Sequence, residues 1–188
     1  MTTASGGLGT DRRRLIAFAL VGAAVAVLLG VYGSVHDPTR EQPYTLFFTG
    51  TINLKVWFAT LSVVFAVIQV LTALRIYGRI SVPRDLPLWL GDFHRLTGTL
   101  AFGFSLPVAY HCLWALGFET GTGWRVIVHA VAGCFFYGAF ATKVLSVRSR
   151  GLPSIVLPVV GGAVFTSLVV LWLTSSVWWW SEFEFPGF

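Results

Sequence analysis

The residues of this chain best suited to chemistry are its four histidines, His36, His94, His111 and His129. All except His36 lie inside long apolar stretches. An ionisable side chain within a membrane-length apolar stretch is costly and is seldom without a function. His111 lies about six residues before the polar turn at 118–124, and His129 lies about four residues after it. In two helices joined by that turn, both imidazoles would lie roughly 6–9 Å below the same helix ends.

Two imidazoles at one depth on neighbouring helices are typical of a b-type haem, whose iron takes two axial nitrogens in an electron carrier. Gly103 lies two turns before His111, and Gly133 lies one turn after His129, so both glycines would leave room for a flat ring. Arg125 is positioned to meet a propionate near the helix ends. The pattern therefore predicts haem b, with His111 and His129 as its metal ligands.

Other interpretations of the same residues stay open. The histidines would serve equally as interhelical hydrogen-bonding groups without a cofactor, as part of a proton path, or as ligands of a bare metal ion. Glycines at helical spacing are also the ordinary means of close helix packing. Haem ligation requires the two helices to stand about 12–13 Å apart, wider than the usual 8–10 Å, so a hairpin would have to separate. Cys112 and Cys134 lie at different depths, and no disulfide is expected between them.

The elements that must position these residues are long apolar helices. The chain has 188 residues, of which 55% are hydrophobic and 11% charged. A hydrocarbon layer about 30 Å thick requires roughly 20 apolar helical residues. Five runs reach that length, at 15–32, 52–74, 93–116, 126–147 and 155–180. We therefore predict an all-α fold in which residues 12–188 form a single domain of about five transmembrane helices, with residues 1–11 as a disordered tail.

The distribution of basic residues predicts the orientation of this bundle. The net charge is +5, and only Arg40, Lys55 and Arg125 fall on the side away from the amino terminus. The remaining ten fall on the amino-terminal side: Arg12, Arg13, Arg14, Arg75, Arg79, Arg84, Arg95, Lys143, Arg148 and Arg150. Basic residues collect in cytoplasmic loops, so we predict a multi-pass protein of the cell membrane with its amino terminus in the cytoplasm and its carboxyl terminus outside. Because this bias accounts for the positive charge, no nucleic-acid partner is expected.

One stretch of the chain resembles a known family. Residues 94–143 contain His-Arg-x-x-Gly from His94, then His111, then His129-x-x-x-Gly133. This pattern resembles the haem-bearing helices of cytochrome b561 and ferric-reductase-like membrane proteins. The resemblance implies electron transfer through b haem, with His111 and His129 as outer-haem ligands and His94 as a possible inner-haem ligand. Those families usually have four membrane histidines, whereas the first, second and fifth apolar runs here have none. The chain also resembles small multi-pass membrane proteins of actinobacteria.

The expected function follows from these residues and from what the sequence lacks. It contains no nucleophile–base pair, phosphate loop or dinucleotide fingerprint, so an independent enzyme is not expected. We predict a haem protein that lies in the lipid bilayer and passes electrons between a quinol or external donor and a partner subunit. The alternative is a structural or assembly subunit without a cofactor. A second haem at His94 would require a partner, and the same residue across a homodimer interface is the only candidate.

Overall fold

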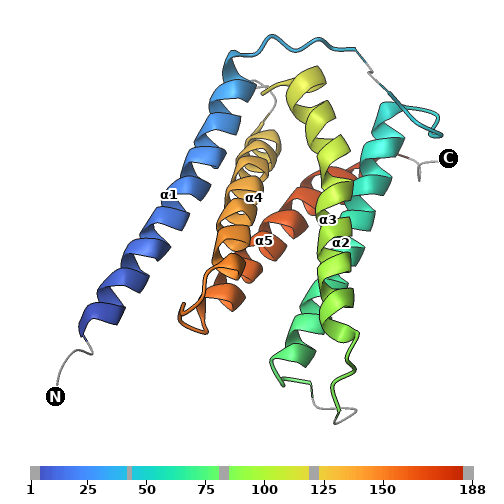
Figure 1. The fold of residues 1–188 in the computed structure, drawn as a ribbon. Helices are drawn as coiled ribbons and strands as arrows, with labels where there is room; N and C mark the ends of the chain where they lie inside the picture. The colour runs from blue at the N-terminus through green and yellow to red at the C-terminus, as the bar shows by residue number, and fades with distance from the viewer. Residues whose placement is uncertain (1–4, 42–43, 81–84, 119–122, 184–188) are drawn as a thin grey trace.

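The computed structural model describes residues 5–41, 44–80, 85–118 and 123–183, with side chains described from residue 11 onward (Figure 1). Within these ranges the regular elements are all helical, and π-helical segments continue α3 and α5. The elements are α1 (Ser5–Val35), α2 (Thr51–Ile76), α3 (Leu90–Tyr110), η1 (His111–Leu116), α4 (Trp124–Arg148), α5 (Val156–Trp172), η2 (Leu173–Val177) and α6 (Trp178–Glu182).

Five helical stretches are long and apolar enough to cross a membrane. They comprise α1, α2, α3 with η1, α4, and α5 with η2 and α6. The predicted all-α fold with five membrane-length helices is therefore confirmed. One boundary differs from the prediction, because α1 begins at Ser5, inside the segment expected to be disordered. Extending an existing helix by one residue is far easier than starting one, so the apolar run propagates helix into the polar tail. Residues 1–4 lie outside the described residues.

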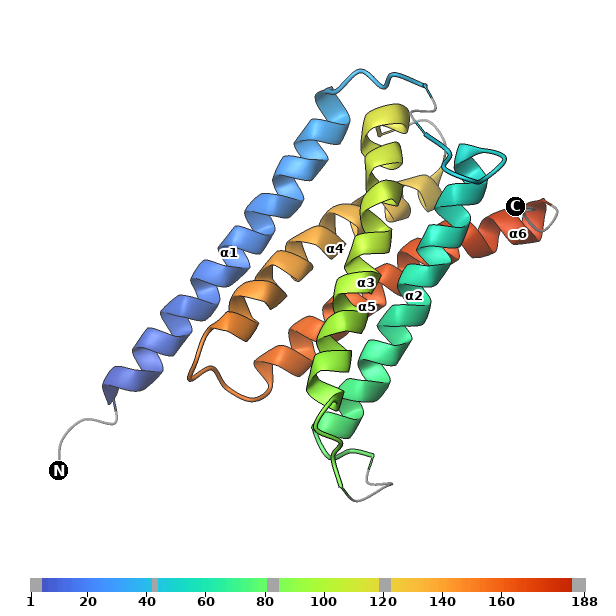
Figure 2. The same cartoon turned by 45° about the vertical axis from the view of Figure 1, so that its right-hand side comes forward.

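The helices pack in a pattern that leaves a space between α3 and α4. The closest packing partners are α2 with α3, α1 with α4, and α4 with α5 (Figures 1 and 2). Among the described residues, the backbones of α3 and α4 do not approach each other closely at several positions, as those of the other three pairs do. The turn at 118–124 predicts that these two helices form a hairpin, which would have to separate for haem to bind between them. These two consecutive helices stand apart because α4 packs instead against α1 and α5.

Small residues bring α1 and α4 together. A Cβ added to Gly138 would lie 3.0 Å from the Cβ of Ala26 and closer still to the carbonyl oxygen of Gly22. One turn further along α4, the Thr142 hydroxyl donates a hydrogen bond to the Phe18 carbonyl at 3.2 Å. Close approach through glycine is common between membrane helices. The packing interpretation of helical glycines therefore holds at Gly138 of α4.

Two of the long helices contain π-helical turns near the same end of the bundle. The segment η1 begins at His111, four residues after Pro107, and η2 interrupts the last helix at Leu173–Val177. Proline has no N–H, so the carbonyl four residues earlier loses its usual partner and the hydrogen-bonding register is disturbed. Single π-helical turns are often found at functional sites. We call this end, where η1, the start of α4 and η2 lie, the outer end, and the opposite end the inner end.

The segment that follows α1 is tied to η1 across the outer end. The N–H groups of Thr39 and Arg40 donate to the carbonyls of Trp114 and Ala115, at 3.3 and 3.0 Å. His36 packs against the ring of Trp114, with ring centroids 4.8 Å apart. These contacts hold His36, Thr39 and Arg40 over the outer end of α3, where Tyr44 packs against His111.

Candidate functional site

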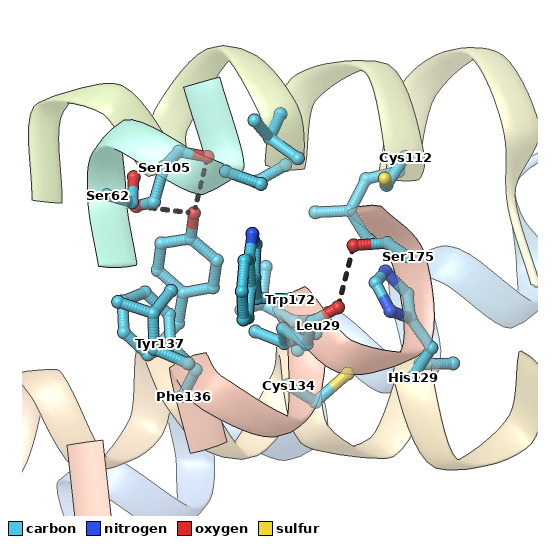
Figure 3. A pocket seen from close by; sticks show the side chains of 18 of the residues that line it. Leu29, Ser62, Ser105, Cys112, His129, Cys134, Phe136, Tyr137, Trp172 and Ser175 are labelled. Carbon is cyan, nitrogen blue, oxygen red and sulfur yellow. Dashed lines mark hydrogen bonds between the residues drawn. The ribbon is translucent and has the colours of Figure 1, made fainter. Parts of the chain in front are cut away.

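The space between α3 and α4 contains a cavity near the outer end, which we call the outer cavity (Figure 3). The space between its lining atoms is about 700 Å³, including the part open to the outside. All five long helices contribute to its wall, and most of the wall is apolar. Its polar or ionisable lining residues are Ser62, Ser105, Cys112, His129, Cys134, Tyr137, Trp172 and Ser175. This is the type of pocket that commonly binds a small molecule or a cofactor.

His129 lines the outer cavity, and its hydrogen bonds define where its lone pair lies. Its Nδ1 is 2.9 Å from the Thr174 hydroxyl oxygen, and that hydroxyl is 2.7 Å from the Val170 carbonyl of its own helix. In the tautomer that has its proton on Nδ1, the hydroxyl donates to the carbonyl and Nδ1–H donates to the hydroxyl oxygen. A neutral imidazole protonated at Nδ1 has its lone pair at Nε2. Metal-binding histidines are commonly held in this way, with one nitrogen hydrogen-bonded and the other free to ligate.

Two further features of the outer cavity bear on whether a flat cofactor fits. The Ser62 side chain has no exposed surface, and its hydroxyl has no hydrogen-bonding partner. Buried polar atoms are nearly always paired, so this hydroxyl is a donor that a ligand would satisfy. A Cβ added to Gly133 would be 3.7 Å from Leu171 Cδ2, an ordinary contact, so close helix packing does not require this glycine. The imidazole, the orphan hydroxyl and the open glycine together fit a planar group with a coordinating metal.

His111 lies outside the outer cavity, although its neighbours Cys112 and Leu113 line it. It is completely buried, and both its ring nitrogens face carbonyl oxygens. Nδ1 is 2.8 Å from the Pro107 carbonyl, and Nε2 is 3.0 Å from the Tyr44 carbonyl. The structure therefore does not bring His111 and His129 together at one cavity. The ring of His111, the first residue of η1, faces the segment after α1, and no sequence pattern indicated that.

Gly103 and Arg125, the other predicted site residues, are also away from the outer cavity. No atom lies within 4 Å of a Cβ added to Gly103, so this glycine borders open space. The Arg125 guanidinium donates to the Thr174 carbonyl at 2.5 Å, and it lies 3.6 Å from the centroid of the Trp178 ring. Arg125 thus ties the start of α4 to η2 and α6, and its predicted role with a propionate stays a prediction.

A second cavity occupies the same gap nearer the inner end, and His94 lines it. We call it the inner cavity, and the space between its lining atoms is about 1220 Å³, including its open part. His94 has the same arrangement as His129. Its Nδ1 is 2.7 Å from the Thr72 hydroxyl, which in turn is 2.8 Å from the Ile68 carbonyl of its own helix. The lone pair of a neutral His94 therefore also lies at Nε2.

Aromatic side chains separate the two cavities. The rings of Phe102 and Phe140 stack across the gap with centroids 4.0 Å apart. Beside them the Tyr137 hydroxyl donates to the Ser105 carbonyl at 3.0 Å, at the end of the outer cavity away from His129 (Figure 3). Phe136 lines both cavities. One gap between α3 and α4 thus contains two cavities in succession, each with a single histidine.

Sequence reasoning missed Ser62, which lines the outer cavity, and Thr72 and Thr174, which contact the histidines of the two cavities. Each is a hydroxyl residue within a membrane-length run, and that is a signal that a reader of the sequence could have used. Their partners could not be inferred, because the pairing of α2 with α3 and of α4 with η2 depends on the tertiary fold.

Bare metal ions are a separate case from haem. Among the described residues, no group of three or more His, Cys, Asp or Glu side chains is placed to hold a metal ion. Cys112 and Cys134 are free thiols that both line the outer cavity. They add soft side chains to its wall without forming such a group with His129.

The fold and the cavities define a class: an all-α chain with five membrane-length helices and a divided, histidine-containing gap between two of them. The chain belongs to the family described as "Family of unknown function (DUF6529)", whose model matches residues 15–187. That match covers α1 from Leu15 onward and the other four long helices in full. No curated protein and no solved structure matches the chain.

Proposed function

We propose that this chain is a multi-pass protein of the cell membrane that binds b-type haem in the outer cavity and passes electrons between a quinol or external donor and a partner subunit. The membrane location is supported by the five long apolar helices and by the ten-to-three distribution of basic residues between the two predicted sides. A reporter fused after Phe188 should read as external if the amino terminus is cytoplasmic.

The observation that carries the haem proposal is the hydrogen bond between His129 Nδ1 and Thr174. In the Nδ1–H tautomer, this bond leaves the lone pair on Nε2 of a ring that lines an apolar cavity, which is the protonation form that ligates iron. Ser62 offers an unpaired hydroxyl in the same wall. When bound, haem would supply one-electron transfer at its iron. The protein's own part would be to hold the imidazole, to exclude water with apolar side chains and to separate this cavity from the inner one.

His129 is the ligand that this proposal requires, and His111 is not. For His111 to ligate in the same cavity, its contact with the Tyr44 carbonyl would have to break and its ring would have to turn toward α4. The proposal therefore departs from the predicted pair of ligands and assigns one protein imidazole to the outer cavity.

A second candidate function is a structural or assembly subunit without a cofactor. It is favoured by one observation: the rings of His94, His111 and His129 all have hydrogen-bonding partners within the protein. Such bonds between membrane helices typically contribute about 0.6 kcal/mol each.

An absorption spectrum of the purified, dithionite-reduced protein distinguishes the two functions. Haem binding predicts a Soret band and b-type bands that are lost in His129→Ala. A well-folded preparation from haem-replete cells without a Soret band would leave the structural subunit as the function.

A further inference from the structure

The inner cavity contains a cation that the protein does not neutralise. Lys143 lines the cavity and is half-buried, five residues before the end of α4 at Arg148. It has no hydrogen bond or ion pair with any described residue, and the one ion pair among these residues joins Arg95 to Asp92 on the exposed surface. Taking an ammonium group out of water is costly unless an opposite charge or hydrogen bonds compensate it. Lys143 therefore marks a place where an anionic ligand would be favoured.

The remaining wall supplies no such charge. None of the described residues lining the inner cavity is acidic, and its other polar side chains are Gln69, Tyr77 and His94. The Gln69 amide already donates to the His94 carbonyl and to the Thr97 hydroxyl. The lone pair on His94 Nε2 and the exposed Tyr77 are left as neutral groups beside Lys143. None of the described residues of this wall therefore supplies an anion for Lys143.

The shape and composition of the cavity indicate which kind of anion fits. Apart from these groups the wall is apolar, with the rings of Phe102, Phe140 and Phe165 and the glycines Gly161 and Gly162. No atom lies within 4 Å of a Cβ added to either glycine, so the wall is open there. The cavity is open toward the inner end, because Tyr77 and Val147 in its lining are 50% and 60% exposed. A small hydrophilic anion would gain nothing from so much apolar surface, whereas an amphiphile would.

We propose that the inner cavity binds an anionic phospholipid, with the phosphate paired to Lys143 and part of an acyl chain lying along the apolar wall. The inner end is the side predicted to be cytoplasmic, where basic pockets between helices bind anionic lipid head groups. This inference rests on the membrane location in the proposed function and not on haem. It assigns haem to the outer cavity and a lipid to the inner cavity.

The test is native mass spectrometry of the full-length protein in detergent, titrated with phosphatidylglycerol or with phosphatidylcholine of the same acyl chains. The wild type should bind phosphatidylglycerol in preference to phosphatidylcholine. Lys143→Met should weaken phosphatidylglycerol binding about tenfold to a hundredfold, because a charge-assisted contact is lost. Arg148→Gln is the matched control, since it removes an exposed cation from the same helix and should change binding less than about threefold.

A second variant keeps the test decisive if Lys143→Met folds poorly. Gly161→Leu fills the cavity without changing charge and replaces a helical glycine with a better helix former, so it should fold and still lose the lipid. Equal binding by the wild type, Lys143→Met and Gly161→Leu would overturn the proposal. Displacement of the lipid by inorganic phosphate alone would also overturn it, because the site would then be a phosphate site. Loss of the Soret band in Lys143→Met with unchanged lipid binding would reassign the cavity to haem, and the wild-type spectrum tests the haem proposal separately.

Discussion

The outer and inner cavities contain the same histidine–threonine pair in different surroundings. In both, a threonine hydroxyl lies within hydrogen-bonding distance of a histidine Nδ1 and of a carbonyl of its own helix; the pairs are His129 with Thr174 and His94 with Thr72. The outer cavity is smaller and adds the unpaired Ser62 hydroxyl, whereas the inner cavity is larger and adds the unpaired Lys143 ammonium. A histidine within a membrane-length helix therefore does not by itself determine which molecule binds beside it. The neighbouring polar groups decide which chemistry is favoured.

The largest expected difference between the cavities is the effect of removing each histidine. His129→Ala should abolish haem binding, because it removes the imidazole lone pair from the outer cavity. His94→Ala is the same truncation in the inner cavity, so it should leave the haem content unchanged within error. Haem per chain, measured by pyridine haemochrome, checks both variants. Haem loss in His94→Ala with retention in His129→Ala would reverse the assignment of the cavities.

The threonines sharpen the comparison at the level of the supporting hydrogen bond. Thr174→Val removes the acceptor for Nδ1–H of His129, and the loss of such a partner typically lowers metal affinity about 10- to 100-fold. Thr72→Val makes the same change beside His94 and should leave haem affinity unaltered. Haem titration into the apoprotein measures both constants. Equal losses in the two variants would mean that the threonines act through general stability rather than through His129.

Two glycine substitutions compare a packed position of α4 with an exposed position of α3. Gly138→Ala should destabilise the protein by about 1–3 kcal/mol, because the added methyl group meets the Gly22 carbonyl and Ala26 of α1. Gly103→Ala should be neutral or stabilising by up to about 1 kcal/mol, since alanine favours helix and no atom lies near the added methyl group. Chemical denaturation in detergent, followed by circular dichroism, gives both values. A destabilisation by Gly103→Ala as large as that by Gly138→Ala would show that Gly103 is packed against another group in solution.

The smallest expected effect concerns the aromatic layer between the cavities. Tyr137→Phe removes the hydroxyl that donates to the Ser105 carbonyl across the gap, at a cost of about 1 kcal/mol. The ring itself remains, so haem binding and lipid binding should persist in their separate cavities. Thermal unfolding of the detergent-solubilised variant measures the cost. Complete loss of either ligand in this variant would mean that the two cavities act as one site.

Much of the fold could be predicted from the sequence, because membrane-length apolar runs are a direct consequence of bilayer thickness. The five long helices follow from that pattern, and the place of each histidine along its helix can be counted from the sequence. The partners of each helix did not follow, since a short connection at 118–124 suggests packing between α3 and α4, while the glycines at 22 and 138 bring α4 to α1 instead. This choice depends on contacts between residues more than 100 positions apart.

The candidate site was predictable only in part for the same reason. His129 and Gly133 both line the outer cavity, whereas the His111 ring contacts the Tyr44 carbonyl. That contact joins residues 67 positions apart, and helical spacing counted along the sequence cannot reveal it. Lys143 is a different case. Its position near a helix end fits the predicted bias of basic residues, but the sequence does not show that it also lines a cavity.

The most direct test of the central claim is the haem stoichiometry of the purified wild-type protein, measured from its reduced-minus-oxidised absorption spectrum. An outer cavity with one ligating imidazole and an inner cavity occupied by lipid predict a b-type spectrum with one haem per chain. Two haems per chain would contradict the division of the gap into one haem cavity and one lipid cavity. A folded protein without any Soret band would contradict the haem assignment itself.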